Sequence, residues 1–103
     1  SYTVLHYTVR SAEQFLEFVF LPTYVNTAKG VIAEAEQRWL EGALIDDPKA
    51  GDVIRGAAGV RKLRVARPGG GKSGGARVVY FYRAAKGRIY LLVAYAKNER
   101  ANL

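Results

Sequence analysis

Residues 76–96, ARVVYFYRAAKGRIYLLVAYA, decide the fold class of this chain. They hold two runs rich in β-branched and aromatic residues, Ala76–Arg83 and Arg88–Ala96, and each run predicts a β-strand. The dipeptide Lys86-Gly87 between the two runs predicts a tight hairpin turn. Val60–Ala66 has the same strand-like pattern, so a third strand is expected upstream of this hairpin.

The first half of the chain is predicted to add one strand and two helices. Tyr2–Val9 alternates β-forming residues and predicts a strand at an edge or at the start of the sheet. Ser11 followed three residues later by Gln14 suggests a capping box, and hence a helix that Pro22 interrupts. A second helix is expected from Thr27 to Leu44, where acidic residues and apolar residues fall on different sides.

These predicted elements define the expected fold. The first helix carries Phe15, Phe18 and Val19. The cluster of Phe15, Phe18, Phe20 and Leu21 is expected to pack in the core rather than dock a partner. The apolar side of the second helix is expected to hold Val31, Ile32, Ala35, Trp39 and Ala43, with Trp39 as a core anchor and with Glu34, Glu36 and Glu41 in solvent. Val53–Gly59 is expected to be a loop or a short extended piece. The predicted class is α+β: a small antiparallel sheet of about four strands with two N-terminal helices packed on one face, in one domain over residues 1–103.

Composition limits the possible chemistry. The chain has 103 residues, enough for one domain with a modest core. It has no Cys, which excludes disulfides and thiolate metal sites, and its single His, His6, provides little material for a metal cluster or a Ser-His-Asp site. No segment has the roughly 18 consecutive apolar residues of a membrane span, so a soluble, cytoplasmic protein without cofactor is expected.

The charge of the chain is strongly divided between its two halves. Residues 1–54 hold 4 basic and 8 acidic residues, a net charge of −4, whereas residues 55–103 hold 12 basic residues and 1 acidic residue, a net charge of +11. The two values sum to the overall net charge of +7. Tyrosines and a phenylalanine are interleaved with this positive charge, a combination that indicates a polyanionic partner such as a nucleic acid.

The glycine-rich stretch 67–75, RPGGGKSGG, ends like a phosphate-binding P-loop but does not fit one. The first glycine of the motif would fall at position 66, which holds Ala66, and a P-loop must lead into a helix rather than into a strand. We therefore expect a flexible basic hairpin loop able to follow a nucleic-acid backbone, with Arg67 and Lys72 in contact with it.

Three cations of the predicted strands are expected to meet on one face of the sheet. Side chains alternate along a strand, so Lys62 and Arg64 share one side while Leu63 and Val65 point toward the helices. If the next strand pairs with this one, its Arg77 approaches the same two cations. Each charge alone is typical of a solvated surface, whereas three charges that converge on one face indicate a functional site.

Several segments together resemble the RelE/HigB family of bacterial toxins. They are DPKAGDVI (residues 47–54), GVRKLR (59–64), GKSGGARVVYFY (71–82) and YAKNE (95–99), in the order in which the family has them. The resemblance covers the second half of the chain, whereas the first half is similar only in layout.

The resemblance implies a toxin of a toxin–antitoxin pair that enters the ribosomal A site and cleaves messenger RNA there. Its implied partners are a cognate antitoxin, the small ribosomal subunit and messenger RNA, with no membrane and with the option of an oligomeric toxin–antitoxin complex. The implied cleavage is metal-independent: the ribose 2′-hydroxyl attacks the adjacent phosphate and the 5′-oxygen leaves. Lysine, arginine and tyrosine side chains are sufficient for this chemistry.

The family's functional positions carry over to individual residues of this chain. Lys62 and Arg64 match the two cations of one strand, with Lys62 as the better proton acceptor because arginine hardly deprotonates. Arg77 matches an arginine that holds the transition-state phosphate, and Lys97 lies where a further basic residue often occurs. The expected catalytic residues are therefore Lys62, Arg64, Arg77 and Lys97, and the expected RNA-binding residues are Arg61, Arg67, Lys72, Tyr80, Tyr82, Tyr95 and Asn98.

Two alternatives remain open at this point. A ParE-like toxin of the same fold would inhibit DNA gyrase without cleaving RNA, and it would not need the cluster of Lys62, Arg64 and Arg77. A noncatalytic basic RNA-binding domain would account for the charge and the tyrosines alone.

Overall fold

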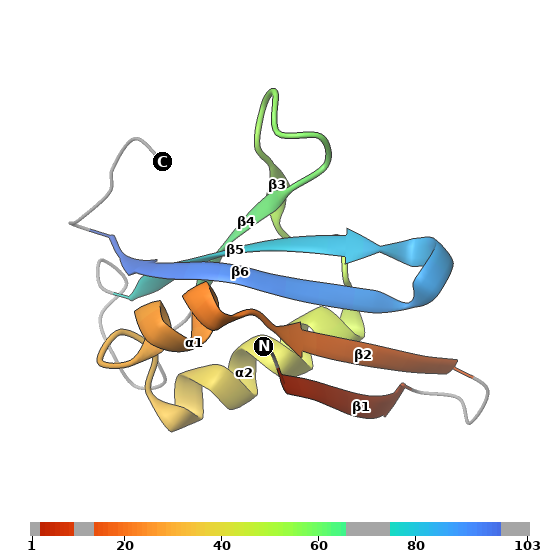
Figure 1. Cartoon of the computed structure of the whole chain (residues 1–103), viewed down its shortest axis with the longest axis horizontal. Helices are drawn as coiled ribbons and strands as arrows, with labels where there is room; N and C mark the ends of the chain where they lie inside the picture. The colour runs from red at the N-terminus through yellow and green to blue at the C-terminus, as the bar shows by residue number, and fades with distance from the viewer. Residues whose placement is uncertain (1–2, 10–13, 66–74, 98–103) are drawn as a thin grey trace.

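A six-stranded sheet and two helices make up residues 3–9, 14–65 and 75–97, the part of the chain that this computed structural model describes (Figure 1). In chain order the elements are β1 (Thr3–Val9), β2 (Gln14–Phe20), α1 (Pro22–Ala28), α2 (Glu34–Asp46), β3 (Asp52–Val53), β4 (Arg61–Val65), β5 (Ala76–Arg83) and β6 (Arg88–Ala96). The order of strands in the sheet is β1-β2-β6-β5-β4-β3. Strands β2 and β6 run parallel, and the other described neighbours are antiparallel. The predicted α+β class is confirmed, but the sheet is mixed and larger than expected.

The strands of the second half lie where the sequence predicts them. Strands β5 and β6 have the predicted bounds, and β4 falls inside the predicted segment. The turn between β5 and β6 contains a short 3₁₀-helix, Ala84–Lys86, and then Gly87 with a φ of 62°. This left-handed conformation suits glycine because glycine has no Cβ to clash with the backbone. The edge position predicted for the first strand is also confirmed.

The first predicted helix is wrong, because residues 14–20 form strand β2. Leu16 and Phe18 are buried on one side of this strand and Val19 is buried on the other, 3% exposed. Strand β2 lies between β1 and β6 in the sheet, and both of its sides carry buried apolar residues. This apolar spacing also fits a helix, which is why periodicity alone does not separate the two structures. Ser11, the predicted cap, lies outside the described residues.

The helical region also differs from the prediction. Pro22 is the first residue of α1, a position that needs no backbone N–H donor, and the predicted helix over 27–44 is divided between α1 and α2. On α2 the buried residues are Glu36, Leu40 and Leu44, whereas Trp39 is 39% exposed and is not a core anchor. Glu36 is buried rather than solvated because its carboxylate accepts a hydrogen bond of 2.8 Å from the N–H of Ala33 at the start of the helix.

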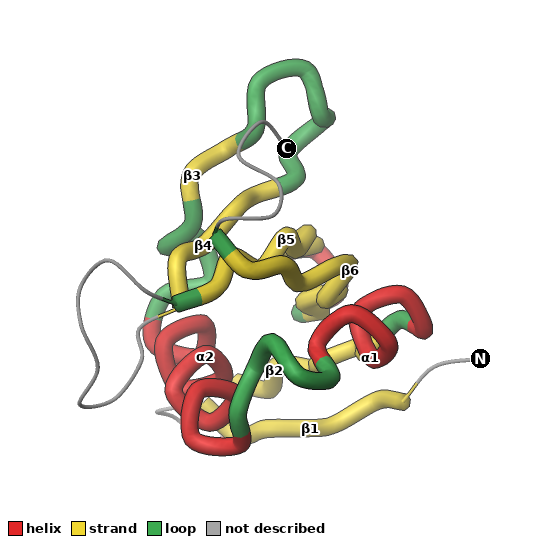
Figure 2. Tube along the Cα trace, turned by 90° about the vertical axis from the view of Figure 1, so that its left-hand side faces the viewer, coloured by secondary structure: helices red, strands yellow, loops and turns green. Residues whose placement is uncertain are grey.

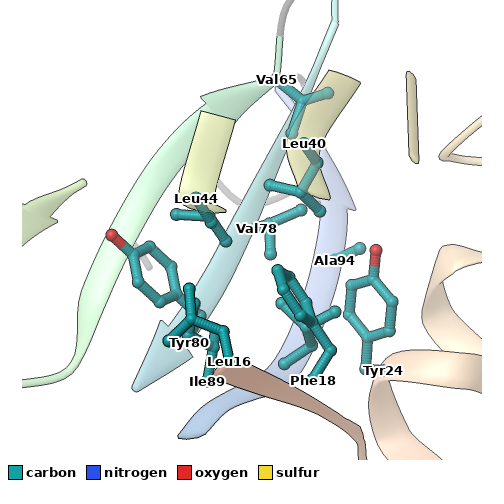
Figure 3. Packing of buried hydrophobic residues seen from close by; sticks show 11 residues of the cluster. Leu16, Phe18, Tyr24, Leu40, Leu44, Val65, Val78, Tyr80, Ile89 and Ala94 are labelled. Carbon is teal, nitrogen blue, oxygen red and sulfur yellow. The ribbon is translucent and has the colours of Figure 1, made fainter. Parts of the chain in front are cut away.

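The hydrophobic core lies between the sheet and both helices. Figure 3 shows side chains from β2, α1, α2, β4, β5 and β6 in contact around Phe18, Leu40 and Tyr80. Figures 1 and 2 show both helices on the same side of β4, β5 and β6, as predicted, while the β3–β4 loop (residues 54–60) projects on the opposite side. No helix among the described residues is long and apolar enough to cross a membrane.

Candidate nucleic-acid site on the outer face of the sheet

The strands β4, β5 and β6 have one face in the core and one face directed away from the helices, which we call the outer face. Val65, Val78, Tyr80, Ile89 and Leu91 are the buried residues that mark the core face. Because side chains alternate, the residues between them occupy the outer face. This alternation decides which cations and tyrosines are available to a ligand.

The three predicted cations share the outer face. Arg64 pairs directly with Arg77 across β4 and β5, and Arg77 pairs with Tyr95 of β6. Lys62 lies two residues from Arg64 on the same side of β4, opposite Val79. Arg64 is exposed, and the other two cations are half-buried. The convergence expected from the sequence is therefore present in the structure.

Lys97 lies at the same end of the sheet. It directly follows β6, it is exposed, and its backbone N–H donates to the carbonyl of Gly75 at 3.5 Å, next to the first residue of β5. We call the group of Lys62, Arg64, Arg77 and Lys97 the cationic cluster. The four residues predicted to be catalytic thus come from the neighbouring strands β4, β5 and β6 and from the residue just after β6.

The cationic cluster has the chemistry of an anion site. Like charges directly opposite each other on a sheet repel, and an anion between Arg64 and Arg77 would relieve that repulsion. The neighbouring outer-face residues Val79 and Tyr95 are buried, so they provide an apolar floor on which electrostatic interactions are stronger than in water. Two guanidinium groups also offer paired N–H donors that match the oxygens of a phosphate.

Arg61, predicted to bind RNA, has a structural role in the described fold. Its guanidinium donates hydrogen bonds to the carbonyl oxygens of Lys49 and Gly51, at 3.2 Å and 2.8 Å. It pairs with Tyr80, a core-face residue, so it lies on the side of β4 opposite the cationic cluster. Arg61 therefore holds the segment that precedes β3, and its contact with RNA stays a prediction.

Tyr80, also predicted to bind RNA, is fully buried. Its hydroxyl donates to the carbonyl of Pro48 at 2.8 Å and accepts the N–H of Gly51 at 2.9 Å. Burial raises the pKa of this phenol, although the hydrogen bond from Gly51 opposes the shift. A Cβ at Gly51 would lie 2.8 Å from the Tyr80 ring and 2.9 Å from the carbonyl oxygen of Lys62, so this position requires glycine. A ring in this position offers no face to a base, so the prediction for Tyr80 is wrong.

The other two tyrosines predicted to bind RNA differ in exposure, because Tyr82 is half-buried and Tyr95 is buried. Tyr82 packs against the hydrophobic core on the inner side of β5. Tyr95 lies on the outer face beside Arg77 but is only 4% exposed. Arg67, Lys72 and Asn98, the remaining predicted RNA-binding residues, lie outside the described residues.

A second group of polar and aromatic residues occupies the other end of the outer face. The rings of Phe81 and Tyr90 lie side by side, with centroids 6.4 Å apart and planes tilted by 34°. Arg83 pairs directly with Arg88 across β5 and β6. We call the group of Phe81, Arg83, Arg88 and Tyr90 the aromatic–arginine cluster. Sequence reasoning did not select it as a site, although the alternation that places Arg77 on this face also places Phe81 and Arg83 there.

The hydroxyl of Tyr90 connects the two arginines of this cluster. Hydrogen bonds from Arg88 and Arg83, together with their positive charge, lower the pKa of Tyr90. Arg88 also forms an ion pair with Glu17 of β2, with 2.6 Å between Nε and Oε1. Arg83 is exposed at the edge of the group.

The described part of the molecule thus has an α+β fold with a mixed sheet. Two helices cover one face of β4, β5 and β6, and the other face is rich in cations, which is an arrangement suited to a polyanionic ligand. Residues 45–103, more than half of the sequence, match the sequence model of a protein family. This family is described as "RelE toxin of RelE / RelB toxin-antitoxin system". The chain therefore belongs to the RelE toxin family, and it is a toxin whose partner is an antitoxin of the RelB type. The match includes β3 to β6 and the whole cationic cluster.

Proposed function

We propose that this toxin is an endoribonuclease that cleaves messenger RNA in the ribosomal A site without using a metal ion. The observation that carries the proposal is the direct pairing of Arg64 with Arg77 on the outer face, with Lys62 two residues away on the same face. Membership of the RelE family, whose members are generally ribonuclease toxins, supports the reaction class. A protein that only binds gyrase would have no need of this arrangement.

The proposed reaction is a displacement at phosphorus. The 2′-oxygen of a ribose forms a bond to the adjacent phosphorus while the bond from phosphorus to the 5′-oxygen breaks, which leaves a cyclic phosphate on one product and a hydroxyl on the other. One proton must leave the 2′-hydroxyl and one must reach the departing 5′-oxygen. Negative charge builds up on the oxygens of the five-coordinate phosphorus between these two events.

The residues of the cationic cluster are assigned to these needs by their chemistry. Lys62 is the proposed proton acceptor, because an amine can exist in its neutral form whereas a guanidinium stays protonated. Arg64 and Arg77 are proposed to bind the phosphate oxygens as their charge increases, where fixed positive charge and bidentate geometry are most effective. Lys97 is proposed to donate the proton to the leaving oxygen.

Expression in bacteria tests the proposal. The wild-type toxin should arrest growth and produce cuts in translated messages that can be mapped at nucleotide resolution. Lys62→Ala, Arg64→Ala and Arg77→Ala should each abolish both effects, whereas Arg38→Ala removes an exposed arginine from α2 and should leave both effects intact. Circular dichroism of the purified variants checks that each one is folded.

The same experiment separates the alternative functions. Growth arrest with intact messages and damaged chromosomes would replace the proposal with gyrase inhibition. RNA binding by a wild-type protein that neither arrests growth nor cuts messages would indicate a noncatalytic RNA-binding domain. Weaker RNA binding at high salt does not discriminate between them, because every basic candidate shows it.

A further inference from the structure

The aromatic–arginine cluster is a site that the proposed cleavage reaction does not use. It combines two arginines placed directly opposite each other with two neighbouring aromatic rings on the outer face of β5 and β6. The ion pair with Glu17 accounts for Arg88, which it ties to β2. It does not account for exposed Arg83, whose charge faces that of Arg88 across the hairpin. The single carboxylate of Glu17 leaves this pair of arginines with a net positive charge, which a further anion would balance.

The cluster lies in line with the cationic cluster. Arg77 and Arg83 are on the same side of β5 and six residues apart, which corresponds to about 20 Å along a strand. Strands β5 and β6 run side by side along the molecule between these two points (Figure 1). A register shift between Val79 and Tyr80 marks a bulge midway, and bulges increase the local twist of a sheet. The outer face therefore connects the two clusters over a length of several nucleotides.

The β3–β4 loop borders this connecting surface. The loop projects on the outer-face side of the sheet in both Figure 1 and Figure 2. A Cβ on its residue Gly59 would lie 3.5 Å from Cε1 of Phe81, so the loop backbone passes close to that ring. Phe81 thus has both the loop and Tyr90 as neighbours, and the two rings are half-buried. Rings held in this way lose little conformational entropy when a base stacks on them.

We propose that the aromatic–arginine cluster binds the RNA strand beyond the scissile phosphate, with bases stacked on Tyr90 and Phe81 and a backbone phosphate held by Arg83. This inference rests on the proposed function, since it takes the cationic cluster as the place of cleavage. Aromatic faces next to cations are the usual means by which proteins bind single-stranded nucleic acid without a preference for sequence. Arg88 and Arg83 lie close enough to the Tyr90 hydroxyl to lower its pKa, so both guanidinium groups are near the ring on which a base would stack.

Binding to short and long RNA tests this inference. The probes are two single-stranded RNAs with 2′-O-methyl riboses, which lack the attacking hydroxyl: one of about four nucleotides, which covers only the cationic cluster, and one of about twelve. For the long RNA, Tyr90→Leu should weaken binding roughly ten-fold through lost stacking. Arg83→Ala should lower the slope of log affinity against log salt by about 0.7, as expected for one lost phosphate contact. Tyr90→Phe, which keeps the ring, should retain most of the affinity.

The short RNA and a matched variant provide the controls. Tyr90→Leu and Arg83→Ala should bind the short RNA like the wild type. Arg38→Ala, which removes an arginine on the helical side, should bind both RNAs like the wild type. Thermal unfolding of each variant verifies its fold, and exposed Arg83 keeps the test informative even if Tyr90→Leu unfolds.

Each other outcome overturns the inference. Unchanged binding of the long RNA by both variants would show that RNA does not use this surface, as would equal losses for both lengths. A loss of antitoxin affinity without a loss of RNA affinity would assign the surface to the antitoxin. If the wild type cuts messages in cells and both Tyr90→Leu and Arg83→Ala bind the long RNA like the wild type, the inference about the aromatic–arginine cluster is refuted and the proposed function is not. A wild type that cuts no message would refute the proposed function.

Discussion

On the core face of β4 and β5, Arg61 and Tyr80 end in hydrogen bonds to the segment 48–51, whereas on the outer face Arg64 and Arg77 face each other across the same two strands. The residue types are similar and the corresponding positions are three residues apart on each strand, yet one pair stabilises a loop and the other pair is proposed to bind an anion. The period of two along a strand produces this division. Residue type alone therefore says little about function in a basic strand, while the parity of its position says a great deal.

The largest expected effect is the loss of catalysis on removing Arg77. Arg77→Ala should lower the rate of message cleavage by about 10² to 10³-fold, because it removes a preorganised donor for the transition-state phosphate. The free energy of unfolding should change by no more than about 0.5 kcal/mol, since the change also relieves the repulsion with Arg64. Cleavage of a reporter message on purified ribosomes and urea unfolding measure the two quantities.

Arg77→Lys sharpens this prediction. It keeps the charge but loses bidentate binding, so its cleavage rate should fall between those of the wild type and Arg77→Ala. If activity and stability fell together in both variants, Arg77 would have a structural role, as the residues of the core face have.

The reverse pattern is expected for Tyr80. Tyr80→Phe should lower the free energy of unfolding by about 1 to 3 kcal/mol, because the buried N–H of Gly51 loses its acceptor. The folded fraction of this variant should still cleave messages at the wild-type rate. Urea unfolding and the reporter assay check the two results, with Tyr82→Phe as a tyrosine control on the same strand. A stable but inactive Tyr80→Phe protein would contradict the division between the faces.

Stability should also fall at alkaline pH. Burial raises the pKa of Tyr24 and of Tyr80 above the unfolded value of about 10. Above that pH the unfolded chain releases protons that the folded chain retains, so the free energy of unfolding decreases as the pH rises through this range. The stabilisation is fully present below pH 10. Urea unfolding at several pH values measures the decrease, and it should be smaller in Tyr80→Phe.

The second half of the chain was the more predictable one for a physical reason. Strands β5 and β6 are joined by a four-residue turn, so local pattern and turn chemistry contain most of the information that positions them. The same parity placed Lys62, Arg64 and Arg77 on one face correctly. Pairing between Phe18 of β2 and Ile89 of β6 connects residues far apart in the sequence, and local apolar spacing does not reveal such a contact.

Within the candidate site, the sequence reasoning counted residues without their environment. Tyr80 and Arg61 were selected as polar groups in a basic stretch, but their hydrogen bonds to Pro48, Lys49 and Gly51 depend on tertiary contacts that no local pattern shows. The aromatic–arginine cluster was missed because its members are separated by a turn and meet only through strand pairing. Parity applied to all of β5 would have found half of it.

The smallest expected effect is that of Trp39→Ala on α2, where the sequence favoured Trp39 as the anchor and the structure buries Leu40 instead. Trp39→Ala should change the free energy of unfolding by less than about 1 kcal/mol, because the side chain is 39% exposed and leaves no closed cavity. Leu40→Ala should cost about 2 to 5 kcal/mol, since Leu40 is fully buried between α2 and the sheet. Urea unfolding measures the free energy of unfolding of both variants. Because the two residues are neighbours in the middle of α2, the position along the helix does not account for a difference between them. Equal losses would mean that the packed face of α2 includes Trp39, and the rotation of this helix against the sheet would then have to be revised.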